Sequence, residues 1–178
     1  MWKIGFYIVG FLLVSMLSTG RAEESLVEVK EVPESHVIWV RTQTPIQRMG
    51  QAMGRVFGEI FRYLGPKGIN PTGPPVAIYY SSPGSEPVDF EVCVPVPAGV
   101  TGDENIKVKT LSGGTMASLI YVGPYRKIGS AYSILTQWIE KSEYSPAGTC
   151  REVYLKGPQE TSNPRDYRTE ILQPIVKR

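Results

Sequence analysis

Histidine and cysteine are scarce in this sequence of 178 residues, which holds one histidine and two cysteines. The single His36 cannot complete a Ser-His-Asp or Cys-His catalytic set, because no paired acid supports it. Cys93 and Cys150 lack the close spacing of metal-binding cysteines. No glycine-rich loop follows a strand and opens a helix, as a phosphate-binding motif would require. We therefore expect no metal and no cofactor.

The apolar run Ile4–Leu17 stands at the N-terminus, after one basic residue. Small residues follow it at Gly20 and Ala22, which is the order of a secretory signal peptide cleaved after Ala22. The run is shorter than the roughly 20 residues that span a bilayer. We predict a signal peptide over residues 1–22 and a mature domain over 23–178, periplasmic or secreted and without a membrane span. An uncleaved N-terminal membrane anchor is the alternative.

Basic and acidic residues are nearly equal in number. The chain has 19 basic and 17 acidic residues, and the leader contains two of the basic residues and no acid. The mature chain is therefore near neutral, and no basic run is present. Because nucleic-acid-binding surfaces are usually strongly basic, we expect no nucleic-acid partner.

The two cysteines have two possible roles. Export would permit a disulfide between Cys93 and Cys150. Cys93 also lies in an apolar, strand-like segment, where a free cysteine is often a small core residue. Both interpretations remain open at the level of the sequence.

The rest of the chain alternates between strand-like and helix-like patterns. Alternating or β-rich segments predict strands, and the first two flank a Pro33-Glu34-Ser35 turn, which predicts a hairpin. Thr44-Pro45 is typical of a helix start, and Gly65-Pro66 of a helix end. The predicted strands are 26–32, 36–41, 76–80, 88–96, 106–111, 115–122, 150–155 and 166–176, with helices over 45–64 and from 125 to about 141, and a loop over 142–149.

The order of these elements repeats in the two halves of the chain, about 26–97 and 106–176. The last strands share one pattern, Glu91-Val92-x-x-Pro95-Val96 and Glu170-Ile171-x-x-Pro174-Ile175. We interpret the chain as two ββαββ units, which predicts an α+β fold with pseudo-twofold symmetry and a central ligand cleft. The glycines at 50, 54 and 58 lie on one helix face and suggest a groove for close packing.

Several motifs resemble one known family when they are taken in order. They are Gly73-Pro74-Pro75-Val76-Ala77-Ile78-Tyr79-Tyr80, Gly123-Pro124-Tyr125, Glu152-Val153-Tyr154 and Thr169-Glu170-Ile171-x-x-Pro174-Ile175. The chain resembles the GyrI-like small-molecule-binding domain over about residues 26–176. This is also the effector-binding domain of multidrug-sensing transcription activators and of the gyrase-inhibitory protein. The resemblance implies a cleft between the halves that binds cationic or aromatic compounds.

The resemblance also implies site residues. The family's cleft acid matches Glu170 on the last strand, with aromatic walls expected from Tyr79, Tyr121 and Tyr154. Glu91 is the repeat mate of Glu170. Simple alternation would instead place these acids outward on their strands, and the tyrosines could be ordinary strand residues. The haem-binding SOUL proteins have a similar duplicated fold, but His36 lies within the second strand and is a poor candidate for a haem ligand.

Three functions follow from these residues. The first is an exported module, expected to be monomeric, that binds amphipathic, aromatic or cationic small molecules. The second is a hydrolase of strained, cyclopropane-type electrophiles that uses Glu170 and a tyrosine, as the resemblance to some family members implies. The third is a protein that binds another protein in its cleft. The sequence favours the binding module, because it offers a cleft acid and aromatic residues but no positioned base and nucleophile.

Overall fold

The computed structural model describes residues 26–81 and 84–178, so the predicted signal peptide lies outside the described residues. The strands are β1 (Val27–Val32), β2 (Ser35–Thr44), β3 (Val76–Tyr79), β4 (Val88–Pro95), β5 (Lys107–Leu111), β6 (Gly114–Val122), β7 (Tyr144–Pro146), β8 (Arg151–Lys156) and β9 (Arg168–Lys177). The helices are α1 (Met49–Leu64) and α2 (Gly129–Lys141). Within the described ranges, no helix is long and apolar enough to cross a membrane. Each predicted strand and helix occurs within a few residues of its expected bounds, and β7 lies in a segment that was expected to be a loop.

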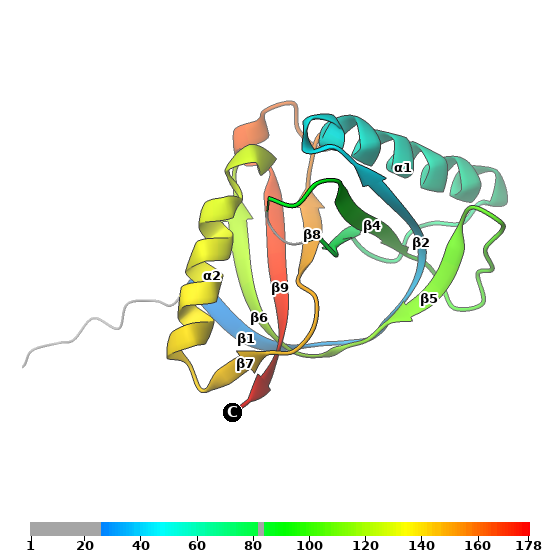
Figure 1. The fold of residues 1–178 in the computed structure, drawn as a ribbon. Coiled ribbons are helices and arrows are strands. Elements are labelled where there is room, and N and C mark those ends of the chain that lie inside the picture. The colour runs from blue at the N-terminus through cyan, green and yellow to red at the C-terminus, as the bar shows by residue number, and fades with distance from the viewer. Residues whose placement is uncertain (1–25, 82–83) are drawn as a thin grey trace, which may run out of the picture.

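The strands form a curled antiparallel sheet in the order β1-β6-β9-β8-β3-β4-β2-β5, and β7 pairs with β9. In Figure 1 the sheet curves beneath the two helices, with β8 and β9 between α2 at the left and α1 at the upper right. The α+β fold class is confirmed. The duplication remains an interpretation of the sequence.

The predicted hairpin of the first two strands is wrong. β1 pairs with β6, whereas β2 pairs with β4 and β5. The Pro33-Glu34 link does not fold the chain back on itself, because Val27 on β1 packs into the apolar cluster beneath α2. The first strand of each half therefore pairs with the second strand of the other half.

The link that follows β1 and the turn that follows β5 cross each other at Gly113. A Cβ atom at this position would lie 2.3 Å from the Val32 carbonyl oxygen and 2.6 Å from the Glu34 nitrogen. Only glycine allows the two backbones to come this close. The crossing fixes how β1 and β5 reach opposite edges of the sheet.

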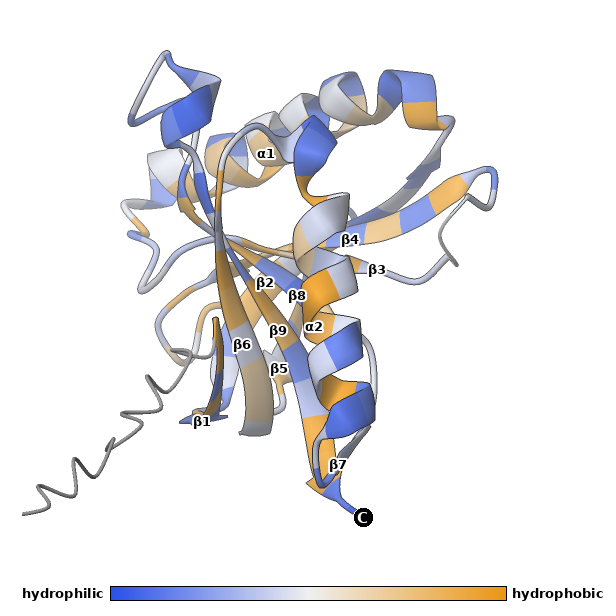
Figure 2. Ribbon diagram, turned by 90° about the vertical axis from the view of Figure 1, so that its left-hand side faces the viewer, coloured by the Kyte–Doolittle hydropathy of each residue, from blue (hydrophilic) through white to orange (hydrophobic). Residues whose placement is uncertain are grey.

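Both helices cover one face of the sheet, which we call the helix face. α1 buries Ala52, Val56, Ile60 and Leu64 against residues of β2 and β4, and α2 buries Ala131, Leu135 and Ile139 against residues of β6 and β9. Figure 2 shows apolar residues along much of β6 and β9 beside α2. A third apolar cluster lies on the other side of the sheet, which we call the opposite face, and contains Val76, Ile78, Val153 and Leu172.

The start of the first helix differs from the expectation. Thr44 ends β2, and no side-chain cap precedes the short 3-10 turn Ile46–Arg48 that leads into α1. The Ile46 N–H, at the start of this turn, instead donates to the Glu86 carboxylate at 3.1 Å. A distant acid therefore satisfies the helix terminus that a local threonine was expected to cap.

Candidate functional site

The middle of the sheet is where the two halves meet. β3 and β8 pair antiparallel, with Ala77 directly opposite Glu152. Val153 and Ile78 belong to the cluster on the opposite face, so strand alternation turns Glu152, Tyr154 and Tyr79 toward the helix face. The small Ala77 side chain leaves room beside the carboxylate.

Glu152 is a buried acid surrounded by phenols. Its carboxylate accepts hydrogen bonds from Tyr132 at 2.9 Å, from Tyr154 at 3.0 Å and from Tyr79 at 3.5 Å. The Tyr79 and Tyr154 hydroxyls also contact each other at 3.2 Å. No basic side chain in the described part of the chain forms a salt bridge with Glu152. The site therefore holds a carboxylate that has neutral donors but no counter-ion.

Burial dominates the protonation chemistry of this group. Removal from water raises the pKa of Glu152, and the three phenol hydrogen bonds lower it in part. Burial also raises the pKa of Tyr79, Tyr132 and Tyr154 above the ordinary value, with the nearby Glu152 adding to the effect. The phenols therefore remain protonated donors at neutral pH, and ionised Glu152 is costly without a cation.

A large cleft opens over Glu152 between α1 and α2, with a volume of about 2020 Å³. Its aromatic wall contains Phe57, Tyr79, Tyr125, Tyr132, Tyr154 and Tyr167. The Tyr125 ring meets Tyr154 edge-on at 5.5 Å between centroids and lies 5.0 Å from Tyr167. Phe57 meets Tyr154 edge-on at 6.4 Å. These ring–ring contacts hold the aromatic side chains in place around the Glu152 carboxylate.

The glycine face of α1 lines this cleft. Gly50, Gly54 and Gly58 all border it, and a Cβ atom added at any of them would meet nothing within 4 Å apart from the neighbouring backbone of its own helix. The predicted close-packing role is therefore wrong. The glycines widen the cleft instead.

Two of the predicted site residues, Tyr79 and Tyr154, line the cleft. Glu170 does not, because its neighbour Ile171 packs beneath α2 and alternation turns Glu170 to the opposite face. There it accepts a hydrogen bond from Ser118 at 2.5 Å and pairs with Lys30. We therefore move the candidate carboxylate from Glu170 to Glu152.

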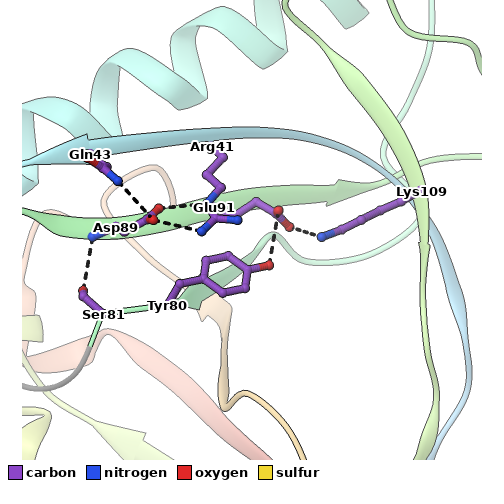
Figure 3. Close-up of polar contacts among 7 residues, drawn as sticks. All are labelled: Arg41, Gln43, Tyr80, Ser81, Asp89, Glu91 and Lys109. Atoms are coloured by element: carbon purple, nitrogen blue, oxygen red, sulfur yellow. Dashed lines mark hydrogen bonds and ion pairs between the residues drawn. The ribbon is translucent and has the colours of Figure 1, made fainter.

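Glu91 has the same kind of environment as Glu170. It pairs with Lys109 and accepts a hydrogen bond from Tyr80 at 3.4 Å (Figure 3). It also accepts a hydrogen bond from the Cys93 thiol at 2.9 Å. It lies on the opposite face and does not line the cleft. β1 thus brings Lys30 to Glu170, and β5 brings Lys109 to Glu91. Each half of the chain supplies the lysine for the buried glutamate of the other half.

The remaining candidates from the sequence, Tyr121 and the two cysteines, donate no hydrogen bond to Glu152. The Tyr121 hydroxyl donates to the Pro124 carbonyl oxygen at 3.2 Å, and its ring packs beneath α2 rather than lining the cleft. Cys93 and Cys150 are free thiols, so the possible disulfide does not form. Cys93 is the buried core residue that the alternative interpretation expected, and Cys150 borders the cleft. No group of metal-binding side chains occurs in the described residues.

Sequence reasoning missed Glu152, Tyr125, Tyr132, Tyr167 and Phe57. One signal was available for Glu152, because it stands two positions before Tyr154 and strand alternation puts both on one face. It also replaces the alanine that the other half has at the matching position. Tyr125 stands in the Gly123-Pro124-Tyr125 motif, but neither it nor the other helix and loop aromatics had a signal that pointed to the cleft.

Comparisons with known proteins agree with this architecture. The family described as the GyrI-like small molecule binding domain matches residues 26–176. The crystal structure of the EcmrR C-terminal domain is 25% identical, with a TM-score of 0.76, over 85% of this chain and 98% of that one. EcmrR in its complex with DNA has a TM-score of 0.77 at 25% identity over 85% of this chain, which spans 57% of that longer chain.

Two more distant structures share the fold. A hydrolase from Listeria innocua is 14% identical, with a TM-score of 0.64, over 88% of this chain and 94% of its own. SAV2435 bound to tetraphenylphosphonium is 12% identical, with a TM-score of 0.60, over 84% of this chain and 93% of its own. No curated protein matches at the sequence level. With the family matched from residue 26 to residue 176, the chain belongs to the GyrI-like small-molecule-binding domain family.

Proposed function

We propose that the cleft between α1 and α2 binds amphipathic aromatic cations, with Glu152 as their counter-ion. The observation that supports this most strongly is the buried Glu152 carboxylate, which has three phenol donors and no salt-bridge partner among the described residues. A buried charge without a counter-ion is costly, and a bound cation removes that cost. The phenol rings add cation–π contacts and flat stacking surfaces.

The wide, aromatic cleft supports a bulky ligand. SAV2435 binds tetraphenylphosphonium, a cation whose charge is enclosed by four phenyl rings. That compound is a suitable probe here because it combines the charge and the aromatic surface that this cleft would select. The cleft is built from one chain, so a monomer is sufficient for binding.

Titration calorimetry with tetraphenylphosphonium tests the proposal. Wild-type protein should bind it saturably, and Glu152→Gln should weaken binding about ten-fold or more, as expected for loss of a desolvated charge pair. Glu140→Gln is the matched control, because Glu140 is an exposed acid on the same cleft. Equal losses in both variants would mean that general negative charge, rather than the buried acid, attracts the cation.

A hydrolase is a second candidate function, with Glu152 in place of Glu170 as its candidate catalytic carboxylate. A carboxylate whose pKa is raised by burial beside protonated phenols has the properties of a general base with nearby proton donors. Incubation with a cyclopropane electrophile, followed by mass spectrometry, tests this. Turnover that is lost in Glu152→Gln would support catalysis, and intact substrate would leave binding as the function.

We also propose that the domain is exported, on the strength of the charged, apolar and small-residue order of positions 1–22. Mass spectrometry of the protein recovered from expressing cells should find an N-terminus at Glu23. A retained leader would support the membrane-anchored alternative. The likeness to EcmrR covers its C-terminal domain, and we propose no DNA partner for this chain.

A further inference from the structure

A second, smaller pocket lies on the opposite face of the sheet. It has a volume of about 340 Å³ and shares no lining residue with the cleft. Segments from both halves form it, including Tyr80 after β3, the β5–β6 turn and the residues before β8. This volume is within the range of small-molecule sites, which begin at about 300 Å³.

The pocket contains an uncompensated cation. Arg151 is opposite Ile78 and Leu172 in the sheet, which places it on the opposite face, where it lines the pocket half-buried. Its guanidinium donates to the Ser112 carbonyl oxygen at 2.9 Å and to the Ser112 hydroxyl at 3.4 Å, and both are neutral. No carboxylate of the described residues pairs with it, and the pocket lining contains no acid. Three of the five guanidinium N–H donors are therefore without a recorded acceptor in the described structure.

The two buried acids on this face, Glu91 and Glu170, are already engaged. Glu91 is held by Lys109 and Tyr80 (Figure 3). It also accepts from the Cys93 thiol, and Glu170 is held by Lys30 and Ser118, so neither acid is available to Arg151. The Tyr80 ring is fixed by Arg41, whose guanidinium lies 4.0 Å from the ring centroid. The positive charge of Arg151 is therefore not neutralised from within the pocket.

The remaining lining gives the chemical class of the occupant. Leu111, Met116 and Ile78 provide a buried apolar floor, while the exposed Ser112 and Thr149 place hydroxyls at the mouth. A planar guanidinium fits a carboxylate with two parallel hydrogen bonds. We propose that this pocket binds a small carboxylate with a short apolar body, held by Arg151. The site is independent of the cation cleft on the helix face.

Titration calorimetry of the full chain with benzoate tests the proposal, with benzamide as the neutral probe of the same shape. Benzoate should bind saturably and benzamide should not. Arg151→Gln should lower benzoate affinity about ten-fold or more, the scale of a lost charge-assisted hydrogen bond. Arg151→Lys should retain part of it, because lysine keeps the charge but loses the planar fork.

Two further variants make the result specific. Arg168→Gln removes an exposed arginine outside the pocket lining and should leave benzoate binding unchanged. Thr149→Trp adds a bulky ring at the exposed mouth and keeps Arg151, so it should abolish binding even if Arg151 variants fold poorly. Equal binding of benzoate and benzamide, or benzoate binding that survives Thr149→Trp in a folded protein, would overturn the proposal.

Discussion

The glycines of α1 provide a quantitative test of the cleft. Glycine in a helix interior is less stable than alanine by about 0.5–1 kcal/mol. Gly54 and Gly58 lie within α1, and a Cβ at either meets nothing within 4 Å. The double variant Gly54→Ala/Gly58→Ala should therefore raise the free energy of unfolding by about 1–2 kcal/mol. For a domain of this size, each 1 kcal/mol shifts Tm by about 2–4 °C, so Tm should rise by about 2–8 °C.

Thermal unfolding followed by circular dichroism measures this change. Gly102→Ala is the contrasting variant, because its Cβ would lie 2.1 Å from the Ile106 carbonyl oxygen and should lower Tm. Gly54→Leu extends the test to function, since a bulky side chain at the cleft wall should weaken tetraphenylphosphonium binding. A lower Tm for the alanine double variant would refute the reasoning, because it would show that the glycine face packs closely against another part of the protein.

Three further variants test the two glutamate environments. Lys30→Met should lower the free energy of unfolding by about 1–3 kcal/mol in urea titrations, because it leaves the buried Glu170 carboxylate without its cation; an unchanged midpoint would show that the pair does not stabilise the exchanged strand. Burial raises the folded-state pKa of Glu152, so its stability contribution is fully present below the unfolded pKa, about 4.3, and is lost as pH rises through the folded pKa. Glu152→Gln should flatten this part of the pH profile of unfolding, and identical profiles would contradict a raised pKa. Tetraphenylphosphonium affinity of the wild type should rise over the same pH window, because the cation favours ionised Glu152. Tyr132→Phe removes the 2.9 Å donor to Glu152 and should lower stability at neutral pH by about 1–3 kcal/mol, and no change in chemical denaturation would show that this hydrogen bond is not formed.

Local sequence patterns predicted the elements because they depend on local physics. The alternation in residues 26–32 and the helical spacing from Ile46 to Leu64 each reflect one buried face. Pairing partners are not encoded in such patterns. The link at Pro33-Glu34 looked like a hairpin turn, yet the strand it ends pairs with β6, because Val27 completes an apolar cluster under α2.

The candidate acid in the cleft differs from the one that the sequence suggested, for a related reason. Matching residues in the two halves suggested Glu91 and Glu170, and the structure explains the match by matched partners. Lys109 pairs with Glu91 and Lys30 with Glu170, so the resemblance between the halves at these positions reflects a shared structural contact. Glu152 differs from its counterpart Ala77, and the difference creates the candidate site.

The tyrosines around Glu152 likewise include two that the sequence predicted and one, Tyr132, that it did not. Tyr79 and Tyr154 were predicted from the family resemblance and from their matching positions in the two halves. The structure adds that their strands pair at the sheet centre and that their hydroxyls lie 3.2 Å apart. Tyr132 comes from α2, whose position over the sheet depends on packing of Leu135 and Ile139. No local pattern announces which helical tyrosine will reach a carboxylate on a strand.

The most direct test of the central claim is a crystal structure of the protein with tetraphenylphosphonium. The account predicts the phosphonium between α1 and α2, with its phenyl groups against Tyr79, Tyr125 and Tyr154 and the Glu152 carboxylate as the nearest negative charge. A cation bound instead beside Glu170 or Glu91 on the opposite face of the sheet would contradict it.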